Sequence, residues 1–322
     1  MDTIKVGVIG VGYLGKYHAQ KYAAIPGVEL VGVADTDEGM GRRVAEQTGA
    51  KYFKDFKELL AVVQAVSVVV PTSGHFEVAS VCLAEGIDVM LEKPMTSTLV
   101  EADALIELAD RRNLVLQVGH LERYNPAILA MEQYLTKPMF IESHRIHVFK
   151  NRGTDVDVVL DLMIHDIDII MSLVNSPIKT IHTVGMPVVT QTTDIANARL
   201  IFENGCTANI TVSRISRDNI RRLRIFQPRS FISVDYAKKE IMVIKHSKEL
   251  GEDGLPKEEI INSCFIEIDA LETELKDFIA NVRARSIPRV SGLAGRRALA
   301  TALLIMEQIK EHIAAHRHFF AE

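Results

Sequence analysis

Polar side chains recur at helical spacing in an otherwise apolar stretch, residues 156–174 (VDVVLDLMIHDIDIIMSLV). They are Asp157, Asp161, His165, Asp168 and Ser172, separated by four, four, three and four positions. This spacing predicts a helix with one narrow polar face. Because Asp161 and His165 are neighbours on that face, the carboxylate can orient the imidazole and raise its basicity. The pair predicts a general base that removes the proton of a substrate hydroxyl.

Two other interpretations of His165 stay open from the residues alone. Many histidines on apolar helices are satisfied within a buried polar network, and Asp161 with His165 could also bind a metal ion. The sequence shows no third ligand at a suitable spacing. We therefore predict no metal site.

Lys93 is the second candidate for chemistry. It stands between Glu92 and Pro94 at the end of a predicted strand, residues 88–91. Pro94 fixes its own φ and restricts the backbone of Lys93, so the lysine is held in one direction. Its ammonium group can hydrogen-bond a substrate hydroxyl or take part in proton transfer. The alternative is a surface lysine that follows a strand.

A glycine turn near the N-terminus predicts the cofactor. An apolar strand at 4–9 precedes Gly10, Gly12 and Gly15, a helix follows them, and a second strand at 29–34 ends at Asp35. This order is typical of a dinucleotide-binding βαβ unit, in which the pyrophosphate lies at the helix N-terminus. A tight turn without a ligand is the alternative.

Asp35 favours NAD over NADP, because a carboxylate accepts hydrogen bonds from ribose hydroxyls and repels a 2′-phosphate. Arg42 and Arg43 on the next predicted helix could weaken this preference, or could form a solvated face. The predicted cofactor-binding residues are Gly10, Gly12, Tyr13, Leu14, Gly15, Asp35, Thr36, Thr72, His75, Glu92 and Lys93.

These residues require two domains to position them. Strands and helices alternate up to residue 120, which predicts a dinucleotide-binding Rossmann domain at 1–120, a doubly wound parallel α/β sheet. Residues 121–322 carry mainly successive strands, which predicts an α+β domain for substrate binding and oligomerisation, with a large open antiparallel sheet. A hairpin turn at Asn204-Gly205, a mobile surface loop at 247–257 and a terminal helix packed on the body are further expectations.

Arginines are concentrated in the second domain. Arg214, Arg217, Arg221, Arg222 and Arg224 lie close in sequence, with Arg145 and Arg152 on an earlier strand and loop. Guanidinium groups suit bidentate phosphate binding, so the cluster suggests an anionic substrate. A solvated or subunit-interface face is the alternative. The predicted substrate-binding residues are Arg123, Tyr124, Asn125, Arg152, Arg217 and Arg222.

Composition limits the class of protein. The chain has 322 residues, 48% of them hydrophobic, and a net charge of −5, which gives no support for a nucleic-acid or membrane partner. Its three cysteines are far apart without metal-ligand spacing, as expected of reduced thiols. No apolar run reaches the ~20 residues of a membrane span. We expect a soluble, cytoplasmic protein.

Several segments resemble the glucose–fructose oxidoreductase / inositol dehydrogenase / MocA family. They are GVIGVGYLGKYHAQ, VVVPTSGHFEVASVCLAEGIDVMLEKPM, VGHLERYNPA, DLMIHDID and LETELKDFIANVRARSIPRVSG, which span nearly the full chain. The resemblance implies a Rossmann domain followed by an α/β domain with an open sheet that often pairs between subunits, in a homodimer or homotetramer. It also implies hydride transfer between a nicotinamide and a sugar or polyol, with Lys93, Asp161 and His165 at the reacting hydroxyl.

Within the family, the stretches RGTDVDVVLDLMIHDID and SRISRDNIRRLRIFQP are most similar to nucleotide-sugar 3-dehydrogenases, some of which oxidise UDP-N-acetylglucosamine in lipid A synthesis. Met163 stands where many members have glycine, and we expect its side chain to reshape the pocket floor. The leading hypothesis is oxidation of C3 of a UDP-amino sugar by NAD. The alternatives are a dehydrogenase of a free sugar or inositol, and a cofactor-binding sensor without catalysis.

Overall fold

The computed structural model describes residues 3–149, 156–265 and 267–316. The chain forms two compact units. Residues 1–124 and 269–297 make up the first unit, and residues 125–268 and 298–322 make up the second. A single boundary at residue 120 does not describe the return of residues 269–297 to the first unit.

The first unit contains the predicted parallel sheet. Its strands are β1 (Ile4–Ile9), β2 (Val28–Ala34), β3 (Lys51–Phe53), β4 (Ala65–Val68), β5 (Asp88–Glu92) and β6 (Leu116–Gly119). They lie in the order β3-β2-β1-β4-β5-β6, and each neighbouring pair is parallel. The order changes direction between β1 and β4, as in a Rossmann fold, so the fold prediction is confirmed.

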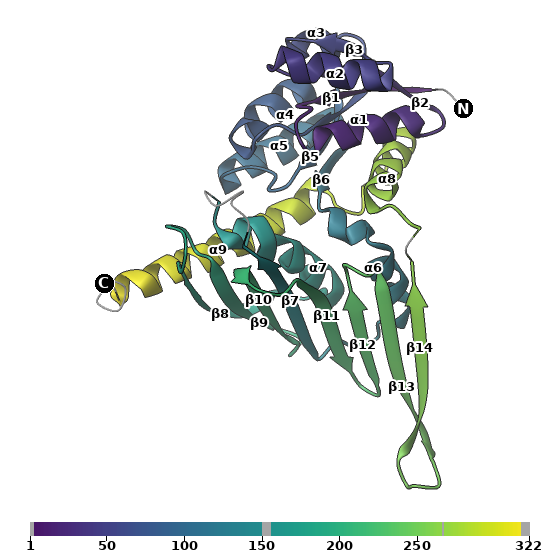
Figure 1. The fold of residues 1–322 in the computed structure, drawn as a ribbon, viewed down its shortest axis with the longest axis vertical. Coiled ribbons are helices and arrows are strands. Elements are labelled where there is room, and N and C mark those ends of the chain that lie inside the picture. The colour runs from purple at the N-terminus through teal and green to yellow at the C-terminus, as the bar shows by residue number, and fades with distance from the viewer. Residues whose placement is uncertain (1–2, 150–155, 266, 317–322) are drawn as a thin grey trace. The chain divides into compact units, whose positions relative to one another are not determined.

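Helices cover both faces of this sheet (Figure 1). They are α1 (Gly15–Ala24), α2 (Glu38–Thr48), α3 (Phe56–Leu60), α4 (His75–Ala84), α5 (Leu99–Arg112) and α8 (Ala270–Ala284), with short 3₁₀ turns η1 (Thr72–Gly74) and η2 (Leu121–Tyr124). Thr98 and Glu101 form a capping box that begins α5. Leu275 and Phe278 of α8 complete the core that contains Tyr22 and Met90.

The second unit contains the second sheet. Its strands are β7 (Phe140–Val148), β8 (Ile178–Met186), β9 (Ile195–Phe202), β10 (Thr207–Ser216), β11 (Ile220–Gln227), β12 (Ser230–Asp235), β13 (Glu240–Leu250) and β14 (Pro256–Cys264). The order is β14-β13-β12-β11-β7-β10-β9-β8. All pairs are antiparallel except β7 with β10. The predicted hairpin turn is present, with Gly205 at φ 87° between β9 and β10.

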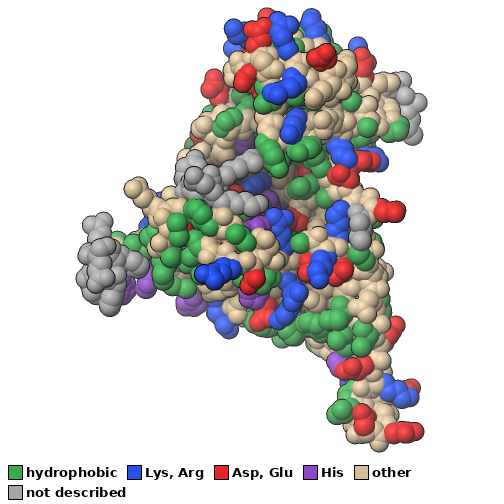
Figure 2. All heavy atoms as spheres, in the orientation of Figure 1, with side chains coloured by type: hydrophobic (Ala, Val, Ile, Leu, Met, Phe, Trp, Pro, Cys, Tyr) green, Lys and Arg blue, Asp and Glu red, His purple; other side chains and the backbone are tan. Residues whose placement is uncertain are grey.

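Helices cover one face of this sheet. Alternate side chains of its strands, such as Ile141, Leu223 and Val243, form a core with helical residues such as Ile167 and Ala302. These helical residues come from α6 (Pro126–Met131), a π-helical turn at Val159–Met163, α7 (Ile164–Val174) and α9 (Gly292–Ala315). The other face carries the remaining alternate side chains, in which hydrophobic and charged groups are mixed (Figure 2).

The prediction of a surface loop at 247–257 is wrong. Strands β13 and β14 extend through it as a long hairpin that projects beyond the other strands (Figure 1). His246 pairs with Glu258 at 3.5 Å and Lys257 with Glu249 at 2.9 Å. The segment resembles a loop in composition because both faces of this ribbon are exposed, so no apolar alternation marks it.

Candidate active site

The predicted cofactor residues of the first unit lie along one edge of its sheet. Ala34, Ile9, Val68 and Leu91 occupy one row, because Ile9 pairs with Ala34 and with Val68, and Val68 pairs with Leu91. The residues directly after this row include Gly10, Asp35 and Glu92. Ligands of open parallel sheets bind at this carboxyl edge, next to the change of strand order.

The three glycines of the first turn have different physical requirements. Gly10 has φ +83°, and a Cβ there would lie 2.8 Å from the Val69 carbonyl oxygen. A Cβ on Gly15 would lie 1.9 Å from the Gly10 oxygen, so the fold itself requires this glycine. A Cβ on Gly12 would meet nothing within 4 Å. Folding does not require Gly12, and the space beside its backbone suits the close approach of a pyrophosphate.

Asp35 joins the glycine turn to the end of β2. Its carboxylate accepts hydrogen bonds from the backbone N–H of Val11 at 2.7 Å and of Asp37 at 2.9 Å. Each carboxylate oxygen can accept a second bond, so the group can also bind ribose hydroxyls. Arg42, which could have neutralised Asp35, instead pairs with Glu38 at 2.7 Å.

Glu92 ends β5 and Lys93 follows it, and both are half-buried. Glu92 Oε1 lies 3.2 Å from His18 Nε2, and its Oε2 accepts a hydrogen bond from the Lys93 backbone N–H at 3.2 Å. Burial would raise the pKa of Glu92, but the hydrogen bond from His18 and the charge of Lys93 outweigh it, so the pKa lies below its usual range. Glu92 is therefore an anion at neutral pH.

His75 holds the Lys93-Pro94 turn rather than presenting its ring at the surface. The ring is buried, with Nδ1 at 2.8 Å from the Pro94 oxygen and Nε2 at 2.9 Å from the Val70 oxygen. Burial lowers the pKa of His75, and the bonds to these carbonyls offset only part of the effect. Thr72 begins η1 and is half-buried, while Tyr13, Leu14 and Thr36 are exposed beside the turn.

The polar helix of the second unit departs from the α-helix expected at 156–174. Residues Val159–Met163 form a π turn, and the N–H of Ile164 bonds to the Val159 oxygen five residues back. The turn adds one residue relative to an α-helix and shifts the faces on either side of it. Asp161 lies within the π turn and His165 follows it, and both are half-buried. Met163 is fully buried in the core, so it does not form a pocket floor.

Two buried clusters fix this helix. Asp194 accepts hydrogen bonds from the backbone N–H groups of Val188, Val189 and Thr190 at 2.7–2.8 Å, and Arg214 beside it donates to the Val156 carbonyl at the start of the helical segment. Burial would raise the pKa of Asp194, but these bonds outweigh it and lower the pKa.

The second cluster lies one residue past His165. Asp166 accepts hydrogen bonds from Arg145 Nε at 2.7 Å and from Ser143 Oγ at 2.8 Å, and all three side chains are buried. Arg145, predicted as part of an anion-binding cluster, thus has an internal partner. The ion pair ties α7 to β7 at the residue next to His165.

The predicted substrate-binding residues occur in both units, and each has its own surroundings. Tyr124 Oη donates to Asp277 at 2.7 Å in the first unit, where Arg123 is buried. Asn125 caps α6 through Ala127 N–H at 3.1 Å and donates to the Tyr236 oxygen. Arg217 is exposed just after β10, and Arg152 lies outside the described residues.

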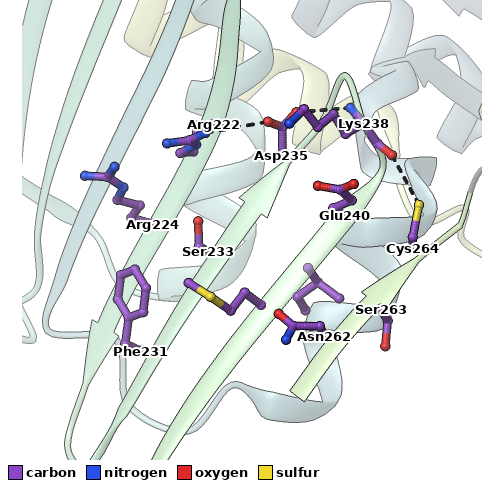
Figure 3. A pocket seen from close by; sticks show the side chains of 12 residues that line it. Arg222, Arg224, Phe231, Ser233, Asp235, Lys238, Glu240, Asn262, Ser263 and Cys264 are labelled. Carbon is purple, nitrogen blue, oxygen red and sulfur yellow. Dashed lines mark hydrogen bonds and ion pairs between the residues drawn. The ribbon is translucent and has the colours of Figure 1, made fainter. Parts of the chain in front are cut away.

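Arg222 lies on the sheet face opposite to the helices. It alternates with Leu223, which is buried in the core, and pairs with Asp235 at 3.8 Å (Figure 3). Arg224 lies on the same face and pairs with Glu142 at 3.7 Å. Both line a hollow of about 620 Å³ with Phe231 and Met242. The sheet thus separates Arg222 from Asp161 and His165 within one chain.

The described residues contain neither a candidate membrane span nor a candidate metal site. None of the described helices combines the length and apolar character that a membrane span requires. Within the same residues, no group of three or more His, Cys, Asp or Glu side chains is arranged to hold a metal ion.

Comparison with known proteins agrees with this geometry. A family described as "Oxidoreductase family, NAD-binding Rossmann fold" matches residues 4–120, and the GFO/IDH/MocA C-terminal domain matches residues 135–229. UDP-N-acetylglucosamine 3-dehydrogenase of Acidithiobacillus ferrooxidans is 40% identical over 308 residues, 95% of this chain and 97% of that protein. A solved structure of that enzyme has a TM-score of 0.90 and 38% identity, over 97% and 99% of the two chains. Myo-inositol 2-dehydrogenase of Thermotoga maritima is 25% identical over 96% and 97%.

Proposed function

Because the chain belongs to the GFO/IDH/MocA family of oxidoreductases and carries its NAD-binding Rossmann fold, we propose that it is an NAD-dependent dehydrogenase of a UDP-amino sugar, which oxidises the C3 hydroxyl of a substrate such as UDP-N-acetylglucosamine to a ketone. The observation that carries the substrate is the 40% identity to a UDP-N-acetylglucosamine 3-dehydrogenase along almost the full length of both chains. The inositol dehydrogenase relative is only 25% identical over a similar length.

NAD, when bound, supplies the hydride acceptor. Gly10, Gly12 and Gly15 hold its pyrophosphate at the N-terminus of α1, with Tyr13 and Leu14 beside it. Asp35 and Thr36 bind the adenosine ribose. Thr72 and Glu92 line the carboxyl edge of the same sheet, after β4 and at the end of β5 respectively. The room beside Gly12 and the unused acceptor capacity of Asp35 support this assignment.

NAD is preferred to NADP in this proposal. The carboxylate of Asp35 would repel a 2′-phosphate. Arg42 and Arg43, which could have compensated, are engaged with Glu38 and with the Met40 sulfur respectively. Asp35→Ala should therefore weaken NAD binding and narrow the preference over NADP.

The reaction needs a base, a group that polarises the hydroxyl and a fixed geometry. We assign proton removal to His165, which Asp161 orients, and polarisation of the hydroxyl oxygen to Lys93. His165 would hold the hydroxyl proton, and NAD, when bound, would supply the acceptor for the hydride that leaves the same carbon, so the alcohol would become a ketone. The buried Arg145–Asp166 pair supports this role, because it holds the backbone beside His165 rigid.

The diphosphate is assigned to Arg217 and Arg152, since Arg222 lies across the sheet. We also propose that the protein is cytoplasmic. In this proposal it forms a homodimer or homotetramer through the open sheet face. Phe140, Phe226 and Phe231 support that pairing, because their rings lie 5.0–5.7 Å apart in succession on this face.

Incubation of the pure protein with NAD and a panel of substrates tests the proposal. UDP-N-acetylglucosamine, UDP-glucose, glucose and myo-inositol are compared by formation of reduced cofactor, with a coupled transaminase to remove an unfavourable ketone product. Turnover of UDP-N-acetylglucosamine with the highest kcat/KM is the expected result. Efficient turnover of myo-inositol without turnover of any UDP-sugar would establish the inositol alternative instead.

A further inference from the structure

A buried chain of hydrogen bonds runs behind Lys93. Tyr22 Oη lies 2.9 Å from Ser67 Oγ, Ser67 Oγ lies 3.2 Å from His18 Nδ1, and His18 Nε2 lies 3.2 Å from Glu92 Oε1. Tyr22, Ser67 and His18 are each at most 1% exposed. The chain connects α1, β4 and β5, and it ends at the residue before Lys93.

The donors and acceptors of this chain match in one direction. Tyr22 donates to Ser67, Ser67 donates to Nδ1 of His18, and Nε2–H of His18 donates to the Glu92 carboxylate. In this arrangement each hydroxyl hydrogen and both ring nitrogens of His18 have a hydrogen-bond partner. The reverse direction would leave the Tyr22 hydroxyl hydrogen without one of these acceptors. Orientation of the Glu92 carboxylate therefore depends on the ring of His18.

Folding alone does not account for these polar groups. Ser67 interrupts the apolar strand β4, and the chain buries a carboxylate at the edge of the sheet, which is costly unless the charge is paired. Glu92 is held on three sides: by His18, by the Lys93 backbone N–H and by close packing on Gly119, whose Cβ would lie 3.0 Å from the carboxylate. Its anionic charge acts on Lys93 and on the nearby His75.

We propose that His18 is a positioning residue for Lys93: it fixes the Glu92 carboxylate, and Glu92 in turn sets the direction and the charge of the Lys93 ammonium group. The inference rests on the proposed function for the role of Lys93. It adds a residue on the phosphate-binding helix whose effect on the reaction passes through Glu92. His18 itself does not touch the reacting atoms.

Two substitutions of His18 distinguish the effect of its hydrogen bond to Glu92 from the effect of the size of its side chain. His18→Asn keeps a polar group near Ser67 and loses the reach to Glu92, whereas the longer amide of His18→Gln can donate to Glu92 in place of Nε2. His18→Asn should lower kcat about 10- to 100-fold, as expected of a displaced reacting group, with the Kd for NAD changed by no more than about twofold. His18→Gln should recover kcat to within about threefold.

Asp88→Asn is the matched control. Asp88 is buried at the opposite end of the same strand and pairs with Arg285 at 2.7 and 2.8 Å, so its substitution also removes a buried carboxylate. It should lower the thermal midpoint and leave kcat within about twofold. In the double variant His18→Asn/Glu92→Gln, the loss of kcat should not exceed that of Glu92→Gln alone, because His18 acts on Lys93 only through Glu92.

A measurement without turnover separates this inference from the proposed function. Pulse acetylation of lysines followed by mass spectrometry gives the pH dependence of Lys93 labelling, with exposed Lys57 as internal reference. Labelling of Lys93 should move to lower pH in His18→Asn and Glu92→Gln, and stay unchanged in His18→Gln and Asp88→Asn. If His18→Asn does not fold, Ser67→Ala replaces it and should move the labelling the same way.

An unchanged pH profile of Lys93 labelling together with an unchanged kcat in folded His18→Asn would overturn the inference. A fold-loss of kcat in the double variant equal to the product of the fold-losses in the two single variants would also overturn it. If no UDP-sugar is turned over but the Lys93 profile shifts as described, the proposed function fails and the link from His18 to Lys93 stands.

Discussion

Gly12→Ala should separate cofactor binding from folding. The structure leaves a Cβ at this position in open space, with no heavy atom within 4 Å, and Gly12 does not have a positive φ. The folded protein should accept the methyl group, and its stability should rise by about 0.4–1 kcal/mol, because alanine restricts the unfolded chain. The thermal midpoint should therefore not fall.

The same methyl group should obstruct the pyrophosphate. It occupies the space where an anion approaches the N–H groups at the start of α1. Loss of one hydrogen bond to a charged group costs about 1.5–3 kcal/mol, which corresponds to a rise of roughly 10- to 150-fold in Kd. Isothermal titration with NAD measures this change, and thermal unfolding of the same sample reports the fold.

Gly15→Ala is the contrasting variant. Its Cβ would lie 1.9 Å from the Gly10 oxygen, so the turn must open before the helix can begin. We expect a destabilised or unfolded protein. An unchanged Kd for NAD in folded Gly12→Ala would refute the placement of the pyrophosphate, and an unperturbed thermal midpoint in Gly15→Ala would refute the packing argument.

Three further predictions concern the second unit. His165→Asn should lower kcat about 10²-fold or more while NAD still binds with normal affinity; full activity in steady-state assays would remove His165 from proton transfer. Arg217→Ala should raise the KM for the UDP-sugar about tenfold, whereas Arg222→Ala on the opposite sheet face should change it by less than about twofold; the reverse order would place the diphosphate at Arg222. Asp194→Asn should cost about 2–4 kcal/mol of stability at pH 7. Folding lowers the pKa of Asp194 below 3.8, so the stability that its carboxylate contributes is present above that pH and is lost as the pH falls through the folded-state pKa. The difference in thermal midpoint between wild type and Asp194→Asn should therefore narrow between about pH 5 and pH 3. A difference that is independent of pH would contradict this role.

The first unit could be predicted from sequence because its chemistry depends on local backbone requirements. Gly10, Gly15 and Asp35 have fixed positions relative to strands that are mainly apolar, so the turn, the strand order and the ligand edge follow from short segments. The hydrogen bonds of Asp35 and Glu92 then come from their places at the ends of β2 and β5.

Several features of the second unit could not be predicted in this way. The π turn at Val159–Met163 changes the phase of the polar face on either side of it. Asp166 was not among the residues of the predicted polar face, and its buried partner Arg145 lies on a strand 21 positions earlier. The parallel pairing of β7 with β10 is likewise non-local.

The role of His18 could not be predicted from the sequence either. It is the fourth residue of α1, the helix that follows the glycine turn, and its spacing from Glu92 carries no local signal. The one hint was Ser67, a hydroxyl within an apolar strand. A polar residue in a buried strand must find a partner, and the structure shows that the partners are Tyr22 and His18.

Transfer of a labelled hydride tests the central claim most directly. UDP-N-acetylglucosamine that carries deuterium only at C3 is incubated with the protein and NAD, and the reduced cofactor is analysed by mass spectrometry. Oxidation at C3 predicts one deuterium on the nicotinamide ring in each reduced cofactor and a 3-keto product without the label. Reduced cofactor that carries no deuterium, with the label retained in the sugar, would contradict the account.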